Sequence, residues 1–260
     1  NSIGSIDGGA GNDSLVLTNV AGINGGAIVD LNQNKLYATA SSSANLSNGS
    51  SSRDLNSIEN VIGTPGNDTL VANGNSSTNT TLIGSEGDDY LVGGAGNDVL
   101  AGGQGEDILA GGVGEDKYII AVSDEDGKRD AGTDSLTNFE ISDKIVLTGF
   151  EITKTVDGSL PSEVSVTRNT SSGFYEVSVE KTSGDNLLSA LIIIEDTSNL
   201  STNETVAIQQ ITDSIMFDEL IDTNSVDPFN SDFEFPFDTS VIDLLSSSSV
   251  REEFFGDHFE

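Results

Sequence analysis

Aspartates recur every nine residues in the middle of the chain, and carboxylates at a fixed period can be arranged to hold a cation. Each is the sixth residue of a nonapeptide with the pattern G-G-x-G-x-D-x-U-x, where U is a large apolar residue. Four copies follow one another without a gap over residues 84–119, and separate copies cover residues 8–16 and 63–71. The aspartates of the four tandem copies are Asp89, Asp98, Asp107 and Asp116.

The repeat itself predicts the elements that position these aspartates. The glycine-rich half forms a turn, because glycine adopts backbone angles closed to other residues. The other half forms a short strand in which only U points inward, since side chains alternate between the two faces of a strand. Two nonapeptides complete one coil, so Asp89 lies over Asp107. Asp98 lies over Asp116 on the opposite edge. The predicted inward residues are Leu91, Leu100, Leu109 and Tyr118.

Stacked carboxylates disfavour one another's charge unless a cation lies between them. A hard cation that takes about 6–8 oxygen ligands suits this environment, because turn carbonyls also point into the gap between coils. Ca²⁺ fits a flexible cage of oxygens, whereas Mg²⁺ requires a tight octahedron and keeps its waters. The alternative is that each aspartate only stabilises its own turn, as aspartate often does.

The tandem repeats resemble those of the RTX (repeats-in-toxin) family of calcium-binding parallel β-roll proteins. Residues 57–63, which lead into a G-N-D turn, also look like a segment of long RTX-type adhesins and exported enzymes. The resemblance implies that several Ca²⁺ ions bind between turns one coil apart, each held by two aspartates and by backbone carbonyls of turn residues. The implied carboxylate ligands are Asp89, Asp98, Asp107 and Asp116. The implied carbonyl ligands are Gly84, Glu86, Gly93, Ala95, Gly102, Gln104, Gly111 and Val113.

Counting in nines extends the roll beyond the tandem block on its C-terminal side. Asp134 comes two nonapeptides after Asp116, so we expect it to complete a further site on that edge. Glu125 takes the equivalent place after Asp107. Asp143 is also in phase, but its unit lacks glycine and is predicted to be strand rather than turn.

Three positions on the N-terminal side are further candidates. Asp68 precedes Asp89 by one coil plus three residues, so we expect a site there. Thr80 stands where an aspartate is expected, which predicts a turn with a weak or empty site. Asp13 belongs to the isolated copy, and the sequence does not identify its partner turn.

We therefore predict an all-β protein, in which a right-handed parallel β-roll follows an irregular N-terminal β segment and precedes a C-terminal antiparallel β cap. A cap protects the core and the sheet edge that a last coil would expose. Hairpins are predicted from residues 27–31 with 36–40 and from 164–168 with 174–181; further strands are predicted at 144–150, 187–196 and 205–211. The predicted divisions are the N-terminal segment 1–62, the calcium-binding roll 63–143, the cap 144–217 and an acidic, Phe-rich tail 218–260.

Composition excludes several classes of function. The formal net charge of −33 argues against nucleic acid, because phosphates would be repelled. The absence of Cys and the single His258 exclude thiolate and multi-His metal sites. No apolar run approaches the length of a membrane span. The chain also lacks H-E-x-x-H, G-x-S-x-G and any nucleophile with a nearby base, so we expect no enzyme activity within these residues.

The function expected from these observations is that of a calcium-folded structural or adhesive module of a secreted or cell-surface RTX protein, such as an adhesin or surface layer. The alternative is the non-catalytic C-terminal region of a secreted protease, lipase, epimerase or haemolysin. The resemblance implies type I secretion, with the tail as its signal; a disordered acidic tail and a docking segment are the other interpretations. The chain starts at Asn1 and its only Met is Met216, so we expect a piece of a longer protein. Besides calcium, the expected partners are a matrix or cell surface, or a second copy of the chain. The outward residues Tyr90, Val92, Val99 and Ile108 are predicted to pack either against the N-terminal segment or against that second copy.

Overall fold

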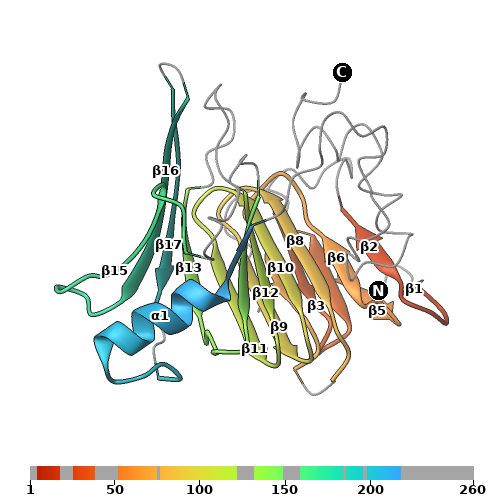
Figure 1. Ribbon diagram of the computed structural model, residues 1–260. Helices are drawn as coiled ribbons and strands as arrows, with labels where there is room; N and C mark the ends of the chain where they lie inside the picture. The colour runs from red at the N-terminus through yellow and green to blue at the C-terminus, as the bar shows by residue number, and fades with distance from the viewer. Residues whose placement is uncertain are drawn as a thin grey trace, which may run out of the picture.

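In the part of the chain that it describes, the computed structural model shows two facing sheets of short strands with one helix at one end (Figure 1). The two sheets hold eleven and seven strands, and most neighbouring strands within them are parallel. The structure describes residues 5–17, 26–38, 52–74, 77–121, 132–148, 159–183, 186–195 and 198–217. Among these residues no helix is long and apolar enough to cross a membrane.

The seven-stranded sheet is parallel throughout. Its strands are short because each nonapeptide supplies only a few extended residues before the next turn. In spatial order they are β18 (Ile215–Phe217), β14 (Lys144–Thr148), β12 (Lys117–Ala121), β10 (Val99–Gln104), β8 (Thr81–Glu86), β6 (Asn60–Ile62) and β2 (Ser14–Val16).

The eleven-stranded sheet is parallel in its middle and antiparallel at both ends. Its parallel part is β3 (Ala27–Asp30), β7 (Thr69–Val71), β9 (Tyr90–Ala95), β11 (Ile108–Val113), β13 (Thr133–Thr137) and β17 (Asn186–Ile194). Beyond β3 lie β4 (Lys35–Ala38), β5 (Ser52–Asn56) and β1 (Ser5–Asp7), and beyond β17 lie β16 (Tyr175–Ser183) and β15 (Val164–Arg168). The β1–β5 pair is itself parallel.

The chain alternates between the two sheets from β8 to β14, which makes the coils of a parallel β-roll. Strands one coil apart pair in register, so Leu91 faces Leu109 across β9 and β11, and Leu100 faces Tyr118 across β10 and β12. The predicted inward residues are all fully buried, and they form the middle of one continuous apolar core. The predicted all-β fold with a parallel roll is confirmed.

The coil after the tandem repeats is longer than predicted. Strand β13 pairs with β11, so that Ile108 faces Ser135, and β14 pairs with β12, so that Lys117 faces Lys144. The corresponding residues on these strands are 27 apart rather than 18, because the chain between β12 and β13 adds a further nonapeptide length without adding a coil. Strand β14 therefore continues the parallel roll, although it falls in the segment predicted to be an antiparallel cap.

Both predicted hairpins are confirmed. Strands β3 and β4 pair antiparallel, as do β15 and β16, and β17 adds antiparallel to β16. The edge of β17 that faces away from β16 pairs in parallel with β13, so the C-terminal hairpin is joined directly to the roll. The predicted tail, residues 218–260, lies outside the described residues.

The strand predicted at residues 205–211 is wrong: these residues lie in helix α1 (Glu204–Ser214). Asn203 caps the helix by accepting a hydrogen bond from the Val206 N–H, as N-cap residues do. The buried residues of the helix are Ala207, Ile211 and Ser214, spaced by four and three residues. That spacing places them on one helical face, and the packing of this face against the core favours helix over the predicted strand.

Candidate metal centre

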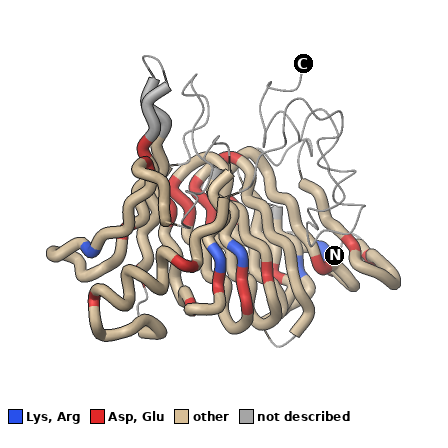
Figure 2. The backbone as a smooth tube through the Cα atoms, viewed as in Figure 1, with Lys and Arg blue, Asp and Glu red and all other residues tan. Residues whose placement is uncertain are grey.

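Register pairing places the predicted aspartates in two stacks, one at each edge of the roll. The first stack contains Asp68, Asp89, Asp107 and Asp134, in the turns that precede β7, β9, β11 and β13. The second contains Asp13, Glu59, Thr80, Asp98, Asp116 and Asp143, in the turns that precede β2, β6, β8, β10, β12 and β14. Acidic residues consequently recur at the turns of neighbouring coils along both edges (Figure 2).

One oxygen of each aspartate in the roll joins its coil to the preceding one. The backbone N–H of Asp89 donates to Oδ1 of Asp107 at 2.8 Å, and that of Asp98 donates to Oδ1 of Asp116 at 2.8 Å. The same bond runs from Asp68 to Asp89 at 2.6 Å. We call this series of bonds the inner ladder. It explains why aspartate suits the sixth position, since a short carboxylate reaches the backbone of the neighbouring coil.

The second oxygen of four of these aspartates has no hydrogen-bond partner although it is buried. These are the Oδ2 atoms of Asp89, Asp98, Asp107 and Asp116, on side chains at most 3% exposed. A buried carboxylate oxygen without a partner is costly, and native structures leave few such atoms unexplained. A positive ligand at this position would remove the cost.

Backbone carbonyls of the next coil lie beside these unpartnered oxygens. A Cβ added to Gly84 would come within 3.0 Å of both Asp89 Oδ2 and the carbonyl oxygen of Gly102. A Cβ on Gly93 would come equally close to Asp98 Oδ2 and the Gly111 carbonyl. The first glycine of the repeat therefore keeps open a space in which a carboxylate oxygen and a carbonyl oxygen converge.

Burial and neighbouring carboxylates raise the pKa values of the stacked aspartates. Burial raises the pKa of Asp89 to about 9, with further contributions from the charges of Asp107 and Asp68. It raises the pKa of Asp134 to about 8, together with the charge of Asp107, and that of Asp143 to about 7. These shifts disfavour the charged form, and a cation would favour it again.

The donor set fits calcium rather than a softer metal. The candidate ligands are all carboxylate or carbonyl oxygens, which hard cations prefer. Within the described residues no three His, Cys, Asp or Glu side chains gather into a cluster that could hold a metal. A site here must therefore combine a carboxylate pair with main-chain oxygens.

The predicted carbonyl ligands differ in what they already bind. The carbonyls of Gly102 and Gly111 lie at the open spaces described above, and the Gly84 carbonyl lies at the equivalent space beside Gly63. In contrast, Gln104 and Val113 accept backbone N–H bonds from Gly87 at 2.8 Å and from Gly96 at 3.1 Å. Glu86 and Ala95 pair in register with these two residues, in β8 and β9. The Gly93 carbonyl is not among those that border such a space, so its role as a calcium ligand stays a prediction.

Two C-terminal expectations need correction. Asp134 does not lie on the edge of Asp116: its Oδ1 accepts the N–H of Asp107 at 3.2 Å, because the intervening coil is 27 residues long. Its place on the Asp116 edge is taken by Asp143, whose Oδ1 accepts the Asp116 N–H at 3.0 Å. Asp143 lies in a turn and not in a strand, and the signals that could have identified it are its phase in the nonapeptide count and its Asp-x-U spacing to Ile145. Glu125 lies outside the described residues.

The structure identifies the partner of Asp13, which the sequence could not. The N–H of Asp13 donates to Oε2 of Glu59 at 2.8 Å, so a glutamate 46 residues away takes the place of the next aspartate. Oδ2 of Asp13 is also buried without a partner. At Thr80 the predicted turn is present, and its N–H donates to Oδ1 of Asp98 at 2.7 Å.

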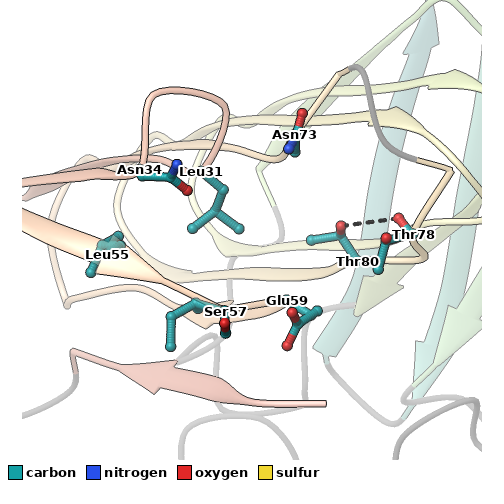
Figure 3. Close-up of a pocket in the computed structure, with 9 residues that line it drawn as sticks. Leu31, Asn34, Leu55, Ser57, Glu59, Asn73, Thr78 and Thr80 are labelled. Atoms are coloured by element: carbon teal, nitrogen blue, oxygen red, sulfur yellow. Dashed lines mark hydrogen bonds between the residues drawn. The ribbon is translucent and has the colours of Figure 1, made fainter. Parts of the chain in front are cut away.

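A small cavity lies where the second stack lacks an aspartate. Its volume is about 150 Å³, and Glu59 and Thr80 both line it (Figure 3). The Thr80 hydroxyl donates to the Thr78 carbonyl at 3.5 Å. The remaining lining residues are Leu31, Asn34, Leu55, Ser57, Ile58, Asn73 and Thr78.

Comparison with known families matches the model of the RTX calcium-binding nonapeptide repeat, in four copies, over residues 5–17, 56–76 and 83–118. Comparison with curated proteins gave no match. Among solved structures, the chain is similar to the AlgE6R3 subunit of the mannuronan C5-epimerase from Azotobacter vinelandii. The two share 19% identity and a TM-score of 0.40 over 63% of this chain and 85% of that one.

Proposed function

Because the chain carries RTX calcium-binding nonapeptide repeats, we propose that it is a calcium-folded structural module of a secreted or cell-surface protein. The observation that carries the proposal is the set of four buried Oδ2 atoms without a partner, on Asp89, Asp98, Asp107 and Asp116. Each of these Oδ2 atoms borders a space that the first glycine of its repeat keeps open. Beside Asp89 and Asp98, a carbonyl oxygen of the next coil borders the same space. When bound, calcium would neutralise the stacked carboxylates and link consecutive coils.

The metal-free roll has few interactions that stabilise its fold. Each nonapeptide contributes one large inward side chain, while every coil brings buried carboxylates into line. Ordering the backbone costs more than such a thin core returns. Since calcium binds only the folded arrangement, its binding free energy becomes folding free energy.

The proposed location follows from the affinity expected of such sites. Extracellular calcium modules bind in the range of about 10⁻⁴–10⁻³ M, far above cytosolic concentrations. The chain would remain unfolded before export and fold outside the cell. The absence of known catalytic motifs from the sequence supports a mechanical or adhesive role over a catalytic one.

Circular dichroism of the whole chain tests the folding role. With chelator we expect the β signal to be lost, and with millimolar Ca²⁺ we expect it to return, whereas equal Mg²⁺ restores it poorly because of its stricter geometry. A spectrum that chelator leaves unchanged would overturn the proposal. The adhesive role is tested separately, by attachment of the immobilised, calcium-loaded chain to bacterial cells and to matrix polysaccharide, with chelator-treated chain as the control.

A further inference from the structure

The last turn on one edge of the roll comes from outside the nonapeptide repeats. Asp143 lies 27 residues after Asp116 and beyond the segment that matches the repeat family. It is completely buried, and its Oδ1 accepts the Asp116 N–H at 3.0 Å. The inner ladder thus continues from the last repeat into a turn that carries no glycine.

Asp116, which is bonded to this turn through its backbone N–H, has an unpartnered carboxylate oxygen. The Asp116 side chain is fully buried, and its Oδ2 has no hydrogen-bond partner. The same open space beside Gly111 contains the Tyr118 hydroxyl: a Cβ on Gly111 would come within 3.0 Å of both oxygens. The Gly111 N–H donates to that hydroxyl at 3.0 Å, so the hydroxyl oxygen is held in place.

We propose that Asp143 and Asp116 together bind a divalent cation of the calcium class, so that a residue outside the repeats completes the last site on this edge. The inference rests on the proposed calcium-binding function and adds a ligand that the repeat pattern does not contain. On the other edge, Asp134 takes the same place relative to Asp107, whose Oδ2 is also buried without a partner.

Asp143 is also suited to end the stack. Its Oδ2 accepts the Glu140 N–H at 2.7 Å, so backbone donors hold both of its oxygens in place, and each oxygen keeps a second lone pair for a cation. Asp68, at the start of the other stack, resembles it: Oδ2 of Asp68 accepts the Thr64 N–H at 2.6 Å. Asp143 and Asp68 therefore each use a donor of their own turn where the interior aspartates have none.

Calcium stoichiometry, measured by isothermal titration and native mass spectrometry, tests the proposal. Asp143→Asn removes the charge of a terminal ligand and should lower the number of bound ions by one. Asp116 lies between two gaps of its stack, so Asp116→Asn should lower the number of bound ions by two. Ser142→Ala is the matched control, because Ser142 lies in the same turn and donates only to the Gly114 carbonyl at 3.0 Å. This variant should keep the wild-type number.

Tyr118 offers a second measurement on the same site, since tyrosine can sensitise the luminescence of bound Tb³⁺. Tyr118→Phe keeps the ring in the core and should lower the luminescence per bound ion without changing the number of ions. In an Asp143→Asn background the same substitution should have no further effect. If Asp143→Asn does not fold in calcium, the single Tyr118→Phe variant still decides the matter, because unchanged luminescence would mean that no ion binds at this end.

The two proposals fail in different ways. If the wild-type chain binds no calcium, the proposed function is wrong. If it binds calcium and Asp143→Asn binds as many ions as wild type, only the inferred site is wrong.

Discussion

The aspartates of the two stacks use their oxygens for different purposes. Oδ1 accepts a backbone N–H from the preceding coil, and Oδ2 of the interior aspartates is left for a cation. Asparagine can perform the first role, because it keeps an acceptor oxygen, but not the second, because it carries no negative charge. Substitution by asparagine therefore separates the fold of the roll from its metal binding.

Asp98→Asn should raise the calcium concentration needed for folding at least about tenfold, which corresponds to about 1.4 kcal/mol. The reason is that Asp98 is fully buried and its Oδ2 loses the charge that would attract the ion. Calcium titration followed by circular dichroism measures the midpoint. Asp88→Asn is the control, because Asp88 is an exposed aspartate in an adjacent turn. The midpoint of the calcium titration of this variant should stay near that of wild type. Equal shifts in both variants would mean that net charge, and not the site, controls folding.

Protonation of the buried aspartates should stabilise the metal-free roll and lower the calcium affinity of the folded roll. Burial raises the folded-state pKa values of Asp98 and Asp107 to about 6 and that of Asp89 to about 9, above the ordinary value of 3.8. The folded state thus binds more protons than the unfolded state between these values, so the metal-free roll becomes more stable as the pH falls from 8 to 5. Protons compete with calcium for the same carboxylates, so the calcium affinity falls over the same range.

Circular dichroism in chelator at pH 5 and pH 8, with calcium titrations at the same two pH values, would check both directions. We expect part of the β signal to return in chelator at pH 5, and more β signal at pH 8 than at pH 5 would contradict the first. Asp89→Asn should reduce the dependence, since it removes the group with the highest of these pKa values.

At the scale of strands and turns, a second ladder runs on the outside of the roll. The Glu106 N–H donates to Oδ1 of Asp88 at 3.0 Å, and the Glu115 N–H donates to Oδ1 of Asn97 at 3.1 Å. Here the side chain of the earlier coil accepts from the later one, which is the reverse of the inner ladder. The junctions between the coils of Asp89 and Asp107 and of Asp98 and Asp116 are therefore bonded in both directions.

Asn97→Ala removes one acceptor of this outer ladder and should destabilise the calcium-bound roll by about 0.5–1.5 kcal/mol, the usual contribution of one hydrogen bond. Asn97→Asp keeps the acceptor and should lose much less. Chemical denaturation in saturating calcium measures the difference. The number of bound ions should be the same in both variants, and a lost ion would show that the outer ladder belongs to the metal site.

Sequence spacing predicted the stacks wherever the nonapeptides are continuous, because a fixed period places equivalent residues one coil apart. The prediction failed where the period is interrupted. Asp134 was assigned to the wrong edge since the coil before it has 27 residues, and Asp143 was taken for strand because its turn has no glycine. Glu59 was not recognised as the partner of Asp13, because the two are 46 residues apart and a glutamate takes the place of the aspartate, although Glu59 stands nine residues before Asp68.

At the scale of the whole molecule, the formal charge of −33 opposes compaction until cations are bound. A folded chain of 260 residues has a radius of gyration of about 18 Å if it is globular, against about 56 Å unfolded. Small-angle X-ray scattering should show the radius falling by at least about a third when Ca²⁺ is added to metal-free chain. NaCl of equal ionic strength is the control, because it only screens charge; an equal contraction in NaCl would argue against specific sites.

The direction of the inner ladder has a consequence for assembly. Every earlier coil in it donates to a carboxylate that comes later in the chain, and β17 with its hairpin partners β15 and β16 stands at the later end. Those three strands pair without any of the stacked aspartates. For the inner ladder, a polypeptide that enters a calcium-rich solution from its C-terminus has the carboxylate acceptor in place before each new turn arrives. A polypeptide that enters from its N-terminus has only the acceptors of the outer ladder in place at that stage.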